Sequence, residues 1–149
     1  MQKFQKLSKN LLEVCLKKNI KILTGESCTG GLLSANITSV PGSSEVFSYG
    51  FICYSNESKK ELLKVSDKVL NSYGAVSYET VKLMLAGLCN QAKANTLTIA
   101  VSGVAGPNGS ESKPVGLVFI GVKISSHDTE VITEYNFGNL ERNEIQQKS

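Results

Sequence analysis

The sequence Ile20-Lys-Ile-Leu-Thr-Gly25-Glu-Ser-Cys-Thr-Gly30-Gly-Leu-Leu-Ser-Ala35-Asn-Ile-Thr38 decides the fold. Its apolar residues Ile20, Ile22 and Leu23 are typical of a short strand, which the following Thr24-Gly25 would end. Residues 29–38 then carry apolar side chains at the spacing of a helix. A strand that passes through a glycine-rich turn into a helix favours an α/β architecture.

Outward from this stretch, the sequence continues to alternate helical and strand-like segments. The other predicted helices are residues 4–18, residues 56–64, a segment that begins after Ser77, and residues 140–148. The other predicted strands are residues 46–54, 96–101, 115–124 and 131–137. Because residues 125–129 join the last two strands as an antiparallel hairpin, we expect a mixed sheet between layers of helices.

The composition is that of one ordinary globular domain. With 149 residues, 41% hydrophobic and 19% charged, the chain suits a single domain over residues 1–149, and disordered, collagen-like and coiled-coil classes are excluded. The net charge of +3 comes without a run of basic residues, so we expect no nucleic-acid partner. Glu13 interrupts the N-terminal apolar run, and no segment approaches the ~20 apolar residues of a membrane span, so we expect no membrane association.

The cysteines predict a reducing compartment. Each of Cys15, Cys28, Cys53 and Cys89 lies in an apolar stretch, as small buried hydrophobic residues do. No two of them form a Cys-x-x-Cys pair, and His127 is the only histidine, which argues against a structural metal site. We therefore expect reduced thiols, no metal and a cytoplasmic protein.

Unusual polar and glycine-rich residues gather in three segments that follow predicted strands. The first is residues 24–31, whose glycines would let a ligand approach the backbone. Free N–H groups at the start of the next helix would attract an anion or a developing oxyanion there. A simpler interpretation is a strand–helix turn in which Ser27 or Thr29 only caps the helix.

The second segment is residues 54–60 and the third is residues 102–109. Lys59 and Lys60 are adjacent, so one could point into a site while the other is solvated, although two surface lysines are the simpler outcome. The third segment is a glycine-rich loop that a structural turn also explains. If the preceding strands are parallel, all three segments meet in one crevice at the carboxyl edge of the sheet.

A serine–lysine pair is the chemistry that such a pocket could hold. His127 lies at the expected hairpin tip, away from the three segments, which disfavours a Ser-His-Asp arrangement. Ser27 would then need a lysine as its base, and that amine must be neutral to accept the proton. Burial or a nearby cation can lower the pKa of a lysine in this way.

Together these segments resemble the CinA C-terminal domain family, which includes nicotinamide mononucleotide (NMN) deamidases. The matching motifs are residues 26–31, 41–44, 54–59, 73–77, 103–109 and 113–116. The resemblance implies an α/β fold, a three-layer α/β/α sandwich with a mixed, mostly parallel sheet that carries an antiparallel hairpin. It implies hydrolysis of the NMN carboxamide to nicotinic acid mononucleotide and ammonia, in pyridine nucleotide recycling, with no cofactor. It also favours a homo-oligomer such as a dimer.

The resemblance also assigns roles to individual residues. The family's nucleophilic serine falls on Ser27, its lysine partner on Lys59 and the motif tyrosine on Tyr54. The C-terminal arginine best matches Arg142, which stands later in its motif than is usual, and Gln146 replaces a second arginine. The expected substrate-binding residues are Cys28, Thr29, Gly30, Gly31, Ser102, Gly103, Gly106 and Arg142, with backbone N–H groups of residues 28–30 as the oxyanion donors.

Two other interpretations stay open at the level of sequence. The domain could be a non-catalytic nucleotide-binding or partner-binding module linked to competence or DNA damage, which tight binding without turnover would favour. It could also be an unrelated phosphate-binding α/β protein in which Ser27 only caps a helix. In that case Lys59 would lie well beyond reach of Ser27.

Overall fold

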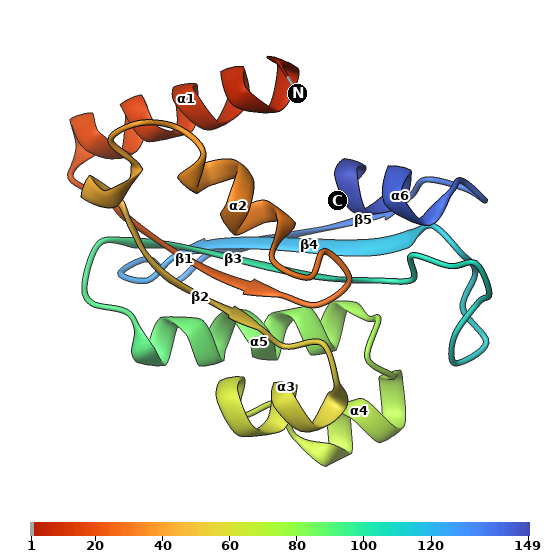
Figure 1. Cartoon of the computed structure of the whole chain (residues 1–149). Helices are drawn as coiled ribbons and strands as arrows, with labels where there is room; N and C mark the ends of the chain where they lie inside the picture. Colours follow the sequence, from red (N-terminus) through yellow and green to blue (C-terminus); the bar gives the residue numbers. More distant parts are fainter. Residues whose placement is uncertain (1) are drawn as a thin grey trace.

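The computed structural model describes residues 2–149 as three layers with a sheet in the middle (Figure 1). The elements are α1 (Gln2–Lys18), β1 (Lys21–Glu26), α2 (Leu32–Thr38), the 3₁₀ turn η1 (Ser43–Glu45), β2 (Phe47–Ile52), α3 (Asn56–Leu63), α4 (Asp67–Tyr73), α5 (Tyr78–Gln91), β3 (Thr96–Gly103), β4 (Leu117–Ile124), β5 (Glu130–Asn136) and α6 (Arg142–Lys148). Helices α1, α2 and α6 cover one face of the sheet, and α3, α4 and α5 cover the other. The predicted α/β/α sandwich is confirmed.

The five strands form one mixed sheet in the order β2-β1-β3-β4-β5. β1 pairs in parallel with β2 and with β3, whereas β4 pairs antiparallel with β3 and with β5. β4 alone therefore runs against the other four strands, which confirms a mostly parallel sheet with an antiparallel hairpin. Because β1, β2 and β3 run in the same direction, their carboxyl ends reach the same edge of the sheet.

The central strand is longer than the sequence predicted. The prediction that Thr24-Gly25 ends β1 is wrong, because Gly25 pairs with both Phe51 and Ala100 and the strand continues through Glu26. The glycine is needed for packing instead, since a Cβ at this position would lie 3.1 Å from Leu63 and 3.2 Å from Leu88.

Other boundaries shift by a few residues. α2 begins at Leu32, three residues later than expected, because Gly30 and Gly31 adopt positive φ angles of 59° and 101° in the turn before it. β3 extends through Gly103, so Ser102 is part of the strand and not of the loop after it. Helix α4 was not predicted at all.

Both faces of β1 are buried, and its alternating side chains fill two separate cores. Ile22 packs with Leu12 and Ile37 in a cluster under α1 and α2. Its neighbour Leu23 packs with Leu88 in a cluster under α5, on the opposite face. All four cysteines are free thiols, and Cys15, Cys28 and Cys53 are buried as expected, whereas Cys89 is only partly buried.

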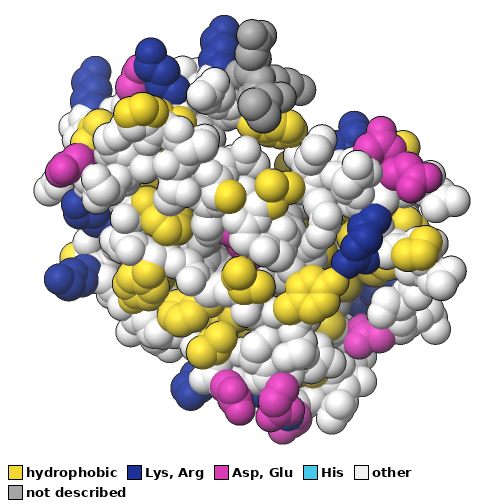
Figure 2. Space-filling model, viewed as in Figure 1, with side chains coloured by type: hydrophobic (Ala, Val, Ile, Leu, Met, Phe, Trp, Pro, Cys, Tyr) yellow, Lys and Arg dark blue, Asp and Glu magenta, His cyan; other side chains and the backbone are white. Residues whose placement is uncertain are grey.

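Within residues 2–149, no helix is both long and apolar enough to cross a membrane. On the face shown in Figure 2, Lys and Arg side chains are dispersed and do not form a single stripe.

Close packing of α5 on α3 gives a stability prediction. A Cβ added at Gly87 would overlap the backbone carbonyl of Leu63, so Gly87→Ala must push α3 away from α5. We expect this variant to lose about 1–3 kcal/mol of unfolding free energy in chemical denaturation. Asn90→Ala, on the exposed face of the same helix, is the control and should stay within about 0.5 kcal/mol of wild type. An unchanged Gly87→Ala midpoint would contradict the packing described.

Candidate active site

Ser27 follows the last residue of β1 and is held by the neighbouring strand. Its N–H donates to the carbonyl of Val101 on β3 at 3.0 Å, which continues the sheet pairing one residue beyond β1. The carbonyl of Ser27 accepts from the N–H of Gly30 at 3.0 Å, which closes a turn over residues 27–30. The Ser27 side chain is therefore fixed at the carboxyl edge of the sheet, where it is almost fully buried.

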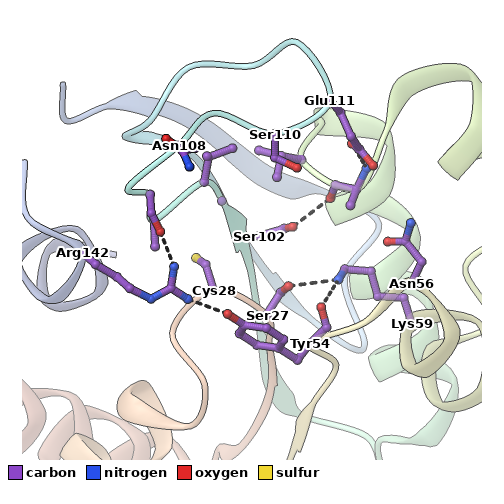
Figure 3. Close-up of a pocket in the computed structure, with 16 residues that line it drawn as sticks. Ser27, Cys28, Tyr54, Asn56, Lys59, Ser102, Asn108, Ser110, Glu111 and Arg142 are labelled. Atoms are coloured by element: carbon purple, nitrogen blue, oxygen red, sulfur yellow. Dashed lines mark hydrogen bonds between the residues drawn. The ribbon is translucent and has the colours of Figure 1, made fainter. Parts of the chain in front are cut away.

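Lys59 reaches Ser27 from the first turns of α3. This helix begins directly after β2, and Ser55 caps it in a reciprocal arrangement with Ser58. The Lys59 side chain is 1% exposed and points back toward the sheet. Its Nζ lies 2.9 Å from Ser27 Oγ, 2.9 Å from the Cys53 carbonyl and 3.3 Å from the Tyr54 carbonyl (Figure 3).

Burial shifts Lys59 toward its neutral form. Burial lowers the pKa of the amine from its ordinary value of 10.5 and outweighs the opposing effects of Cys53, Cys28 and Glu111. A neutral amine has two N–H bonds and one lone pair. In the neutral form, the carbonyls of Cys53 and Tyr54 can accept the two N–H groups, which leaves the lone pair to accept from the Ser27 hydroxyl.

The adjacent lysine shows the opposite environment. The Lys60 side chain is partly exposed and pairs with Glu57 at 3.3 Å and Asp67 at 3.1 Å. Hydrogen bonding to Asp67 and then to Glu57 raises the pKa of Lys60. Of the two lysines, one thus points into the site and the other lies at the surface, as one of the two sequence interpretations proposed.

The turn between α4 and α5 forms a wall of the site and holds the glycine-rich loop. The Ala75 carbonyl accepts a hydrogen bond from Ser102 Oγ at 2.8 Å. The Ala75 N–H donates to the Glu111 carboxylate, also at 2.8 Å. The Lys113 ammonium donates to the carbonyls of Tyr73, at 2.5 Å, and Val76. Sequence reasoning assigned no role to this turn, although residues 73–77 and 113–116 were among the matching motifs.

Arg142, the first residue of α6, closes the opposite side. Its guanidinium donates to the Tyr54 hydroxyl at 2.5 Å and to the carbonyl of Gly106. One turn further along α6, Gln146 donates to the Cys28 carbonyl at 2.9 Å. The late position of the arginine in its motif therefore does not keep it from the site.

These walls enclose an open cavity of about 380 Å³. The residues that line it are Ser27, Cys28, Tyr54, Asn56, Lys59, Ala75, Val76, Ser102, Gly103, Val104, Ala105, Gly106, Asn108, Ser110, Glu111 and Arg142. Eight of the predicted site residues are among them. Asn56, Asn108, Ser110 and Glu111 also line the cavity but were not predicted as site residues. For Asn56 and Asn108 the available signal was their place in the matching motifs 54–59 and 103–109.

Comparison with known proteins shows the family to which the chain belongs. Residues 4–149 match the CinA C-terminal domain family. The chain belongs to that family. It is 47% identical over 128 residues to a CinA-like protein of Prochlorococcus marinus, which covers 85% of this chain and 30% of the relative. It is 46% identical over 136 residues to a CinA-like protein of Thermotoga neapolitana, which covers 90% of this chain and 32% of the relative.

A solved structure of the same family shows the same fold. The competence/damage inducible protein CihA from Agrobacterium tumefaciens matches with a TM-score of 0.92 at 35% identity, over 97% of this chain and 87% of that one. The chain spans about a third of the length of the curated relatives it matches. The resemblance found in the sequence is confirmed at the level of family and fold.

Three residues expected to bind substrate in this CinA domain do not line the cavity. Thr29 Oγ1 donates to the Glu26 carboxylate at 2.6 Å, and the Gly31 N–H donates to it at 3.0 Å. The Gly30 N–H donates to the Ser27 carbonyl. The Thr29 hydroxyl and the N–H groups of Gly30 and Gly31 therefore build the turn from inside and are not free to bind a ligand. Glu26, which sequence reasoning left without a role, accepts the hydrogen bonds of the Thr29 hydroxyl and the Gly31 N–H.

The described residues offer no ready metal site. No group of three His, Cys, Asp or Glu side chains within residues 2–149 is arranged to hold a metal ion. His127 follows β4, in the turn before β5, and does not line the cavity. The chemistry that the cavity itself presents is a hydroxyl aligned with a buried amine.

The Lys59 pKa can be measured directly. Carbon-13 NMR of labelled lysine side chains should show one lysine that titrates clearly below 10.5, because desolvation disfavours its ammonium form. That signal should vanish in Lys59→Met. It should persist in Lys60→Ala, because the pKa of Lys60 is raised and its signal is a different one. If all lysines of the wild type titrated together, the neutral-amine interpretation would be wrong.

Proposed function

We propose that this domain is a nicotinamide-nucleotide amidohydrolase that converts NMN to nicotinic acid mononucleotide and ammonia. The observation that carries the proposal is the 2.9 Å contact between Lys59 Nζ and Ser27 Oγ, inside a polar cavity and away from bulk water. The same contact speaks against Ser27 as a mere helix cap. The substrate is inferred from the family resemblance, and membership of the CinA family supports it.

The proposed reaction begins with acyl transfer to Ser27. As Ser27 Oγ attacks the carboxamide carbon, its proton passes to the neutral Lys59 amine. The tetrahedral intermediate collapses when Lys59 returns that proton to the departing nitrogen, which leaves as ammonia. Water then attacks the ester on Ser27 and gives a proton to Lys59. Lys59 returns that proton to Ser27 Oγ as the acyl–oxygen bond breaks, which releases nicotinic acid mononucleotide and restores the serine hydroxyl.

Backbone amides next to the nucleophile are suited to stabilise the oxyanion. The N–H groups of Gly31, Leu33 and Ser34 are already used by Glu26, and those of Gly30 and Leu32 by backbone carbonyls. In the described part of the chain, the N–H groups of Cys28 and Thr29 are the ones in this turn that no protein acceptor engages. We assign the oxyanion to them, because preorganised amides at this position act without reorganisation.

The charges around the cavity suit a zwitterionic nucleotide. Arg142 and Glu111 lie on different sides of the cavity in Figure 3. The Glu26 carboxylate already accepts from the N–H groups at the start of α2, so these amides are not free for a phosphate. The phosphate of NMN therefore belongs near Arg142 and the loop around Gly106. The cationic pyridinium ring would then lie closer to Ser27, where it also opposes protonation of Lys59.

An NMN turnover assay tests the reaction. Ser27→Ala and Lys59→Ala should each lower kcat by about 10³-fold, since one removes the nucleophile and the other the general base. Release of ammonia and formation of nicotinic acid mononucleotide are measured together. Lys60→Ala is the matched control and should retain activity, because its ammonium is tied to surface carboxylates. Full activity in Ser27→Ala would refute the proposal, as would tight NMN binding by a wild type that never turns it over.

Recognition of the phosphate can be tested at Arg142. Arg142→Ala should raise KM for NMN about 10-fold or more, because charge-assisted hydrogen bonds are lost, while kcat changes less. Nicotinamide riboside, which lacks the phosphate, should show no such change. Arg142→Lys keeps the charge without the planar fork and should be intermediate. An equal rise in KM for both substrates would show that Arg142 does not contact the phosphate.

A further inference from the structure

Glu26 is a buried carboxylate that the proposed reaction does not use. It is 0% exposed, and within the described residues no Lys, Arg or His forms a salt bridge with it. A buried charge without a counter-ion is costly unless hydrogen bonds replace its hydration. Here the hydrogen bonds come from a single short segment of the chain.

Five donors converge on this carboxylate. Oε2 accepts from Thr29 Oγ1 at 2.6 Å and from the N–H groups of Gly31 and Leu33 at 3.0 Å each. Oε1 accepts from the N–H and the hydroxyl of Ser34, at 2.8 and 2.6 Å. All five donors lie between residues 29 and 34, so the side chain ties the end of β1 to the turn and to the start of α2.

The backbone of Glu26 is tied to the other half of the site. Its carbonyl accepts from the N–H of Cys53 at 2.7 Å, and the carbonyl of Cys53 accepts from Lys59 Nζ at 2.9 Å. The backbone of Cys53 therefore links Glu26, which precedes the Ser27 nucleophile, to the Lys59 base. Any shift of Glu26 changes the position of Ser27 relative to Lys59.

We propose that Glu26 is a positioning residue, an internal anion that holds the Ser27 turn in one conformation with Ser27 Oγ against Lys59. This proposal rests on the proposed function, because the reaction that Ser27 and Lys59 would carry out is the hydrolysis of NMN. The carboxylate occupies the amide donors at the start of α2, so the turn is organised before any substrate binds. Preorganisation of this kind acts on the rate of attack at Ser27 and not on substrate affinity.

Glu26→Gln is the first test variant, because it keeps the size of the side chain and removes its charge. The Gln oxygen can replace Oε2 and keep three donors, but its NH₂ then faces the N–H of Ser34, which becomes unpaired. Thr29→Val is the second and milder variant, because it removes one of the five donors without touching the charge. Thr98→Val is the control, since Thr98 is a buried hydroxyl on β3 that bonds to the Lys123 carbonyl far from the cavity.

Two readouts are needed, and one does not depend on NMN. The first is kcat and KM for NMN. The second is the rate constant with which an alkyl fluorophosphonate labels Ser27, followed by intact-protein mass spectrometry to completion. The labelling rate constant reports the reactivity of correctly folded molecules, whereas the final labelled fraction reports how many molecules are folded.

We expect Glu26→Gln to lower both kcat and the labelling rate constant about 10- to 100-fold, with KM little changed and labelling still complete. Thr29→Val should lower the same two quantities a few-fold, which also decides the case if Glu26→Gln does not fold. Thr98→Val should lower the unfolding midpoint and leave both rate constants as in wild type.

Two results would overturn the positioning role. In one, the Glu26→Gln and Thr29→Val labelling rate constants equal that of wild type and only the labelled fraction falls, so Glu26 serves stability alone. In the other, KM rises while kcat and labelling are unchanged, so Glu26 serves binding. If wild type labels rapidly at Ser27 but does not hydrolyse NMN, the proposed substrate fails, and the labelling comparison still decides the role of Glu26.

Discussion

The contact between a buried lysine amine and a serine hydroxyl constrains much of this structure. Removing Lys59 from water is costly for its charged form, so the amine must lie where two backbone carbonyls accept its N–H groups. Those carbonyls belong to Cys53 and Tyr54, which directly follow β2. Because Lys59 must turn back to them, α3 has to begin only a few residues after the strand. At Gly87, α5 closely approaches the backbone of Leu63 at the end of α3, and Leu63 packs in the same cluster as Leu23 of β1.

Much of this arrangement could be predicted from the sequence, because it depends on periodicity and topology. The apolar patterns located the strands, and parallel strands necessarily bring the segments that follow them to one edge. The sequence therefore predicts Ser27, Lys59 and Ser102 around one pocket, and the structure brings all three to one cavity. The family resemblance added Arg142, which also reaches that cavity despite its late position.

What could not be predicted depends on side-chain direction at the ends of elements. Because β1 was expected to stop at Gly25, Glu26 was treated as part of a ligand-binding loop. The strand continues, and Glu26 instead points inward to the amides that seemed free for an anion. Lys113 was likewise part of a matching motif, but only the fold shows that it bonds to the α4–α5 turn, because that contact joins residues 37 positions apart.

The occupied start of α2 also explains why the C-terminal helix matters to the site. A glycine-rich turn before a helix usually offers its amides to a phosphate, but here a carboxylate of the protein takes that place. In the proposed reaction the phosphate of NMN would then have to be recognised elsewhere, and the guanidinium of Arg142 lines the cavity. Arg142, Ile145 and Gln146 lie on one face of α6, so the buried Ile145 that anchors the helix also aims Arg142 at Tyr54 and Gln146 at Cys28. The helix thereby links Arg142 at the rim of the cavity to the turn that carries Ser27.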